Sequence, residues 1–227
     1  MNNNDIDTSR DFANRLIVES AFSGFHKASW LCCQSLYNPS YEFSTPILNT
    51  LKDMNIPATP ETAAELLVKS ALEAHPDACW VLNTIIRRHD KEKDAEPHCF
   101  SVLRQHNIDP TIEYADYLGM AAALHAHPKA AWIAAQVVRH TDKSVNAGRM
   151  HFLESVGVQP SNKLLAALYT IAALGENSEA GAICYSYLSN GDNSYIPLTD
   201  IVKTLDISTE EFKKLLCSYH NEESGNC

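Results

Sequence analysis

The chain has 227 residues, of which 45% are apolar and 20% charged, so it is long enough and apolar enough to bury a sizeable core. Its net charge is −10 and no basic run is longer than Arg87-Arg88, which argues against nucleic acid and anionic membranes as general partners. No segment has the roughly 18–20 consecutive apolar residues that a membrane-spanning helix needs.

Cysteine usage indicates a reducing compartment. The seven cysteines are an odd number, and Cys32 and Cys33 are adjacent. Cys79 and Cys184 lie among apolar residues at helical spacing, where a free thiol packs as a small hydrophobe. The first residues have neither the basic nor the apolar region of a secretory signal. We therefore expect a cytoplasmic protein.

One ten-residue segment recurs four times along the chain, at intervals of about 50 residues, which is the sequence signature of stacked supersecondary units. The copies are Ala21–Trp30, Ala71–Trp80, Ala123–Trp132 and Ala173–Ala182. A second, weaker set follows them at Leu48–Ile56, Phe100–Ile108, Met150–Val158 and Thr199–Ile207. We call the resulting units the first to fourth repeats, with approximate bounds 8–57, 58–109, 110–159 and 160–207.

Each repeat is predicted to hold three helices, because apolar residues recur with helical spacing and a helix-start signal follows each second segment. Thr59 and Asp109 are predicted N-caps followed by proline, and Ser208 with Glu211 fits a capping box. In chain order the predicted helices are 8–23, 27–37, 45–54, 60–73, 76–89, 97–106, 110–126, 128–141, 145–156, 161–174, 178–189, 197–205 and 208–220.

The sequence thus predicts an all-α fold: one helical-repeat array, α-solenoid-like, over residues 1–220. The helix at 208–220 caps the last repeat, and a polar tail occupies 221–227. The stretch Gly175–Ala180, continuing to Tyr185 and Leu188, resembles the helix start of tetratricopeptide and Sel1-like repeats. The resemblance covers one helix. Those families have shorter units of two helices, whereas each unit here is predicted to hold three.

The second helix of each repeat is predicted to bury one stripe of residues. In the second repeat the stripe is Ala78, Val81, Leu82, Ile85 and Ile86, and in the third it is Ala130, Ile133, Ala134, Val137 and Val138. With Ala78 at zero, Trp80 falls at about 200° and Arg87 at about 180°, on the opposite side of the helix.

The residues on this opposite side are Trp30, Tyr37, Trp80, Arg87, Trp132 and Arg139. Two interpretations stay open. The tryptophans are spacers between repeats, with Arg87 and Arg139 complementing helix C-terminal dipoles. Alternatively, all six side chains form a ladder on the concave surface of the array and bind a partner, because Trp and Arg are enriched at binding hot spots.

No catalytic or metal-binding constellation is predicted. His75-Pro76 and His127-Pro128 are equivalent positions at helix starts, so a repeated capping role explains them. Cys99 follows His98 directly, and neighbours in sequence project about 100° apart on a helix. His151 has Glu154 at helical spacing, but Ser155 completes no triad with them. Phosphate-binding glycine motifs are absent from the sequence. We therefore expect no enzymatic activity, no cofactor and no metal.

The function expected from these patterns is that of a non-enzymatic protein–protein interaction module, an adaptor or scaffold subunit. Its partners are expected to be proteins with basic segments, because the chain is acidic. Two alternatives remain: a chaperone or adaptor for a secreted or translocated client, and an enzyme or small-molecule-binding regulator with a site between repeats. The sequence does not indicate an oligomeric state.

Overall fold

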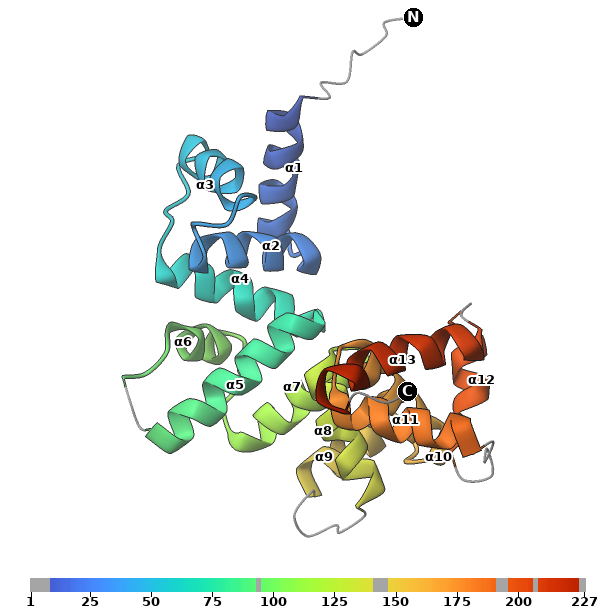
Figure 1. Ribbon diagram of the computed structural model, residues 1–227. Helices are drawn as coiled ribbons and strands as arrows, with labels where there is room; N and C mark the ends of the chain where they lie inside the picture. The colour runs from blue at the N-terminus through green and yellow to red at the C-terminus, as the bar shows by residue number, and fades with distance from the viewer. Residues whose placement is uncertain (1–8, 93–94, 141–146, 191–195, 206–207, 225–227) are drawn as a thin grey trace, which may run out of the picture. The chain divides into compact units, whose positions relative to one another are not determined.

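The structure is a computed structural model that describes residues 9–92, 95–140, 147–190, 196–205 and 208–224. Throughout these residues the fold is all-α, with thirteen helices and no strand, as predicted (Figure 1). The helices are α1 (Arg10–Phe22), α2 (His26–Tyr37), α3 (Ser44–Asp53), α4 (Pro60–Leu72), α5 (Pro76–Glu92), α6 (His98–Gln105), α7 (Ile112–Leu124), α8 (Pro128–Arg139), α9 (Ala147–Ser155), α10 (Asn162–Leu174), α11 (Ser178–Asn190), α12 (Leu198–Lys203) and α13 (Thr209–Ser224).

A helix lies at each of the thirteen predicted ranges. The differences are at the ends: α5 continues to Glu92 and α13 to Ser224, past the predicted ends at 89 and 220. The last part of the predicted tail, residues 225–227, lies outside the described residues, as do residues 145 and 146 of the predicted helix 145–156.

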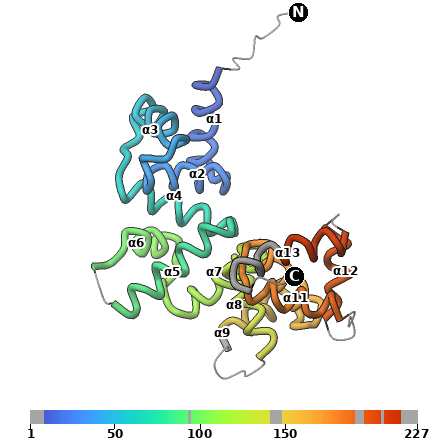
Figure 2. Tube along the Cα trace, in the orientation of Figure 1, coloured from blue at the N-terminus to red at the C-terminus, as the bar shows by residue number. Residues whose placement is uncertain are grey.

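The chain divides into two compact units, residues 1–115 and 116–227, and the division falls within α7. The single domain over residues 1–220 stays a prediction. In the N-terminal unit, α1 packs against α2 and α3, while α4 packs against α2, α5 and α6; Figure 2 traces this chain path. Its core includes Leu51, Leu66, Leu67, Leu82 and Leu103, each no more than 1% exposed.

In the C-terminal unit, α10 packs against α8, α11 and α12, and α13 packs against α11 and α12. Tyr169 of α10 and Phe212 of α13 are fully buried and are the largest side chains of this core. In both units the first helix of a repeat therefore lies against the second helix of the preceding repeat, α2 on α4 and α8 on α10.

The first helix of every repeat, and α13, begins at a Ser or Thr side chain that accepts a backbone N–H. These caps are Ser9, Thr59, Thr111, Ser161 and Ser208. The capping box of Ser208 and Glu211 is confirmed in both directions, at 3.1 and 3.0 Å. The prediction of Asp109 as a cap is wrong: Thr111 accepts from the Tyr114 amide, so the helix starts two residues later.

The turns between first and second helices share one backbone geometry. Gly24, Ala74, Ala126 and Glu176 all have positive φ, and each following N–H bonds back to a carbonyl of the helix just ended, as His75 N–H does to Ser70 O at 3.1 Å. This arrangement is the Schellman motif, which satisfies carbonyls at a helix C-terminus. Three of the four residues are not glycine, which is why composition gave no signal for these turns.

The predicted buried stripe of the second helices is partly wrong. Ile133 of α8 is 38% exposed, whereas Ala131 and Ala135 are fully buried. In α5, Val81 and Ile85 are half-buried, and Cys79 and Asn83 are buried instead. The buried face is rotated towards the tryptophan side because a second helix such as α2 packs on two first helices, α1 and α4.

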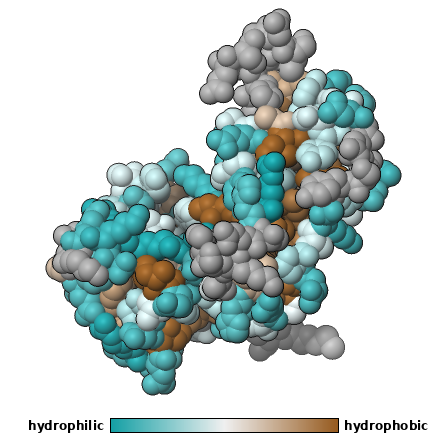
Figure 3. All heavy atoms as spheres, turned by 90° about the horizontal axis from the view of Figure 1, so that it is seen from below, coloured by the Kyte–Doolittle hydropathy of each residue, from teal (hydrophilic) through white to brown (hydrophobic). Residues whose placement is uncertain are grey.

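Apolar side chains also reach the surface, in separate patches framed by polar side chains on the face drawn in Figure 3. None of the helices within the described residues has the length and apolar content needed to cross a membrane.

Candidate functional site

The three tryptophans are half-buried and lie at equivalent positions of α2, α5 and α8. The Trp30 ring lies 5.5 Å from the ring of His75, which follows α4. The Trp132 ring lies 6.0 Å from that of Tyr169 in α10. Each of these two tryptophans thus contacts the next repeat and keeps part of its surface open to solvent.

The residues seven positions after the tryptophans differ in their surroundings. Tyr37 is 51% exposed at the end of α2. Arg87 is half-buried, and its Nε donates to Oδ1 of Asn83 at 2.7 Å. Arg139 is exposed, and its Nη1 lies 3.5 Å from the Tyr169 hydroxyl.

The dipole interpretation therefore does not fit Arg87, because α5 continues past it to Glu92. Arg139 does lie in the last turn of α8. Within a helix, each tryptophan and the residue seven positions later share a face. Trp30 and Trp80 belong to the N-terminal unit and Trp132 to the C-terminal unit, so a ladder along all three stays a prediction.

A capping role was predicted for both His75 and His127, and the structure shows the capping hydrogen bond for His127 but none to Nδ1 of His75. His127 is 9% exposed, and its Nδ1 accepts the Ala130 amide at 3.2 Å; Asn177 accepts the Ala180 amide in the same way. The capping role of His127 is thus confirmed. The Nδ1 of His75 is buried and has no hydrogen-bond partner. Its ring is held instead against Trp30 and, at 5.8 Å, His26, and burial lowers the pKa of His75.

An exposed aromatic group follows α2 that the sequence reasoning missed. Tyr41 and Phe43 are 49% and 41% exposed, and their ring centres are 5.5 Å apart. The loop that carries them is held by the Ser44 hydroxyl, which donates to Asn38 O at 2.8 Å. With Tyr37 they place three aromatic side chains at the surface of the first repeat.

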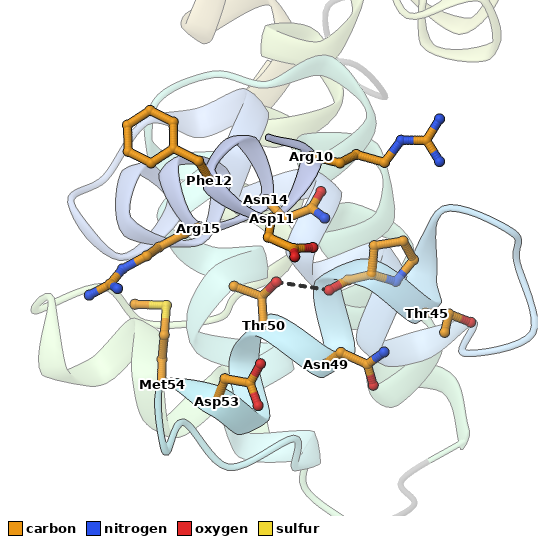
Figure 4. Close-up of a pocket in the computed structure, with 11 residues that line it drawn as sticks. Arg10, Asp11, Phe12, Asn14, Arg15, Thr45, Asn49, Thr50, Asp53 and Met54 are labelled. Carbon is orange, nitrogen blue, oxygen red and sulfur yellow. Dashed lines mark hydrogen bonds between the residues drawn. The ribbon is translucent and has the colours of Figure 1, made fainter. Parts of the chain in front are cut away.

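A groove of about 780 Å³ lies between α1 and α3 (Figure 4). Asp11 points towards Thr50, whose hydroxyl donates to Pro46 O at 2.9 Å, while Arg10 and Arg15 point away. A second groove, of about 470 Å³, lies between α4 and α6 and is lined by equivalent residues, such as Glu61 for Asp11. Polar residues line much of both grooves. In the sequence such residues have the pattern of an ordinary solvated helix face, so the grooves could not be predicted from it.

Of the residues weighed for catalysis, His98 and Cys99 lie in the N-terminal unit and His151 in the C-terminal unit. His98 lies in the α4–α6 groove, with Nδ1 3.4 Å from Oε1 of Glu61. Its neighbour Cys99 is 3% exposed, and burial raises the pKa of that thiol to about 11, so little thiolate exists at neutral pH. His151 lies exposed on α9, in the other unit.

The other buried cysteines share this chemistry. Burial raises the pKa of the thiols to about 12 for Cys32, Cys33, Cys79 and Cys184. Cys79 and Cys184 are fully buried in the apolar core, as predicted. Across the described ranges, no three His, Cys, Asp or Glu side chains are placed to share a metal ion.

Comparison of the chain with protein-family models, curated proteins and solved structures finds no match.

Proposed function

We propose that the chain is an α-solenoid-like array of four three-helix repeats closed by α13, and that it binds proteins as an adaptor or scaffold subunit. The recurring Ser/Thr caps, the positive-φ turns and the packing of α2 on α4 and of α8 on α10 support the array. Its place is the cytoplasm, in keeping with free, buried thiols.

One observation carries the binding function: Trp30, Trp80 and Trp132 recur at one repeat position and all stay half-buried. A ring that was only a spacer would gain most by complete burial. The partner-binding residues are Trp30, Tyr37, Trp80, Arg87, Trp132 and Arg139. The acidic chain favours partners with basic segments, and electrostatic attraction makes association faster at low salt.

The sharpest variants are Arg139→Ala and Tyr37→Ala, because both side chains are exposed. Each should change the free energy of unfolding by no more than about 0.5 kcal/mol. Each should weaken the partner by about tenfold or more, as expected of hot-spot residues. The partner is first captured by photo-crosslinking from position 37 in native lysate, identified, and then titrated against purified variants by calorimetry.

Val156→Ala is the matched control, since Val156 is also exposed, at 46%, and lies outside the second helices. It should leave affinity unchanged. Trp132→Ala should lower the melting temperature, because the contact with Tyr169 is lost. Unchanged affinity in both Arg139→Ala and Tyr37→Ala would leave the tryptophans as spacers and contradict the ladder.

A further inference from the structure

The contact between the first and second repeats contains a histidine whose ring nitrogen is buried without a hydrogen-bond partner. This residue is His75, in the turn between α4 and α5, and the buried atom is Nδ1. Its ring lies 5.5 Å from the ring of Trp30 and 5.8 Å from that of His26, both in α2. In the same contact the Ser70 hydroxyl of α4 donates to His26 O at 2.8 Å. His75 therefore packs where α2 meets α4, within the N-terminal unit.

The other repeats leave no such atom at this position. Phe25, His127 and Asn177 hold the repeat position of His75. Nδ1 of His127 and Oδ1 of Asn177 each accept a backbone amide of the helix that follows, at 3.2 and 2.9 Å. Phe25 has no polar side-chain atom to satisfy. Of these four residues, His75 is the one that combines a polar ring with a buried nitrogen lacking a partner.

The surroundings of His75 favour a neutral ring. Burial is the main cause that lowers the pKa of His75, because a protonated ring in the contact loses its hydration. Asp77 of α5 acts in the opposite direction, while His26 and the exposed Lys27 of α2 add to the effect of burial. The closed contact thus binds a proton less readily than a solvated histidine does.

The last turns of α4 carry two further charged side chains. Nζ of Lys69 lies 2.7 Å from Oε1 of Glu65 in the same helix, and Glu73 is exposed, so that solvent screens its charge. Neither carboxylate accepts a hydrogen bond from Nδ1 of His75. Protonation of that nitrogen would therefore place a charged N–H group where it has no acceptor.

One attraction opposes this cost. A protonated imidazole beside the face of Trp30 gains a cation–π interaction. A buried, charged N–H group, however, forfeits a charge-assisted hydrogen bond to water, which is the stronger interaction. Movement of the His75 ring into solvent restores that hydrogen bond and ends the ring contacts with Trp30 and His26. The proton and the packed contact therefore compete.

We propose that His75 makes the contact between the first and second repeats sensitive to pH: the neutral ring holds α2 on α4, and protonation releases the ring and loosens these two helices. Because the opened state binds the proton more readily, the contact is intact above the ordinary histidine pKa of about 6.5 and weakens as the pH falls below it. The inference goes beyond the proposed function and does not rest on it, since it needs no partner.

Amide hydrogen exchange of the full-length protein tests the proposal at about pH 7.5 and about pH 5.5, on either side of the ordinary histidine pKa. Rates are divided by those of the unfolded chain at the same pH to give protection. Protection of α2 and α4 should fall by about threefold or more at the lower pH. His75→Asn and His75→Phe, which place at 75 the residues found at 177 and 25, should each remove most of this fall.

Two further histidines of the N-terminal unit provide controls. His106 is exposed at the end of α6, so His106→Asn should keep the full fall in protection. His89 also has a buried Nδ1 without a partner, but its ring packs on Phe100 of α6, 4.9 Å away. His89→Asn should likewise keep the fall in α2 and α4. Loss of the fall in His89→Asn would assign it to the α5–α6 contact and overturn the proposal.

Three other results would overturn it: equal protection at both pH values in the wild type, an undiminished fall in both His75 variants, or greater protection at the lower pH, which would mean that the cation–π attraction to Trp30 prevails. Circular dichroism checks the fold of each variant. A second measurement needs the wild type alone: deuterium exchange at the imidazole carbon between the two ring nitrogens, mapped by mass spectrometry, gives the titration midpoint of His75. A midpoint at or above about 6.5 would also contradict the proposal.

Discussion

Gly175 and Gly181 show how closely single residues fit in the C-terminal unit. Gly175 ends α10, and a Cβ built there would lie 2.0 Å from Cβ of Pro128, the first residue of α8. Gly181 lies within α11, where a Cβ would meet Leu216 at an ordinary 3.8 Å. The first position has no room for a methyl group, whereas the second has.

Gly175→Ala should therefore lower the free energy of unfolding by about 1–3 kcal/mol, because Pro128 must move and the contact of α8 with α10 opens. Gly181→Ala should raise it by up to about 1 kcal/mol, since alanine is the better helix former. Urea unfolding followed by circular dichroism measures both. Equal stability of Gly175→Ala and the wild type would contradict this close approach of α8 and α10.

At the scale of the helix, most of the fold could be predicted because caps and apolar spacing are local signals. Thr59 caps α4 as predicted, and Ser161 caps α10 at the start of the predicted helix 161–174. The wrong predictions concern features that depend on tertiary packing, or on two side chains that compete to cap the same helix. Asp109 precedes a proline and is a good cap by type, but Thr111 captures the amide. Ile133 fits the apolar period, but α8 packs on α10 and buries Ala131 and Ala135, which leaves Ile133 38% exposed.

The assignment of Thr111, and not Asp109, as the N-cap of α7 can be tested directly by substitution. Thr111→Ala should cost about 1 kcal/mol of unfolding free energy, because the Tyr114 amide loses its acceptor. Asp109→Ala should cost less than about 0.5 kcal/mol, as for a surface residue without a structural role. Thermal and urea unfolding report the difference. The reverse order would restore Asp109 as the cap.

The candidate site was predictable only in part, for a similar reason. Trp30, Trp80 and Trp132 could be found because repetition marks equivalent positions. The grooves could not, because each is shared by two helices, α1 with α3 or α4 with α6, that are separated in sequence. The exposed pair Tyr41 and Phe43 lies in a loop, where apolar residues carry no periodic signal.

For the whole molecule, an array makes neighbouring repeats exchangeable, because each repeat contacts only those next to it. Deletion of residues 161–207 joins Pro160 to Ser208 and offers α13 to α8 in place of α10. The shortened chain should stay helical and unfold cooperatively. Deletion of residues 137–183, equal in length but out of register, should give a chain that unfolds without a cooperative transition. Similar melting curves for the two deletions would argue against the array.

The buried thiols can report local opening of the structure, because each is shielded from solvent in the closed state. A thiol reagent reaches Cys32, Cys79 or Cys99 in the N-terminal unit, or Cys184 in the C-terminal unit, only when the surrounding helices part. The reaction rate of each cysteine, read by mass spectrometry under native conditions, therefore reports how often its own neighbourhood opens. Partner binding could be followed through these rates without adding a label to the chain.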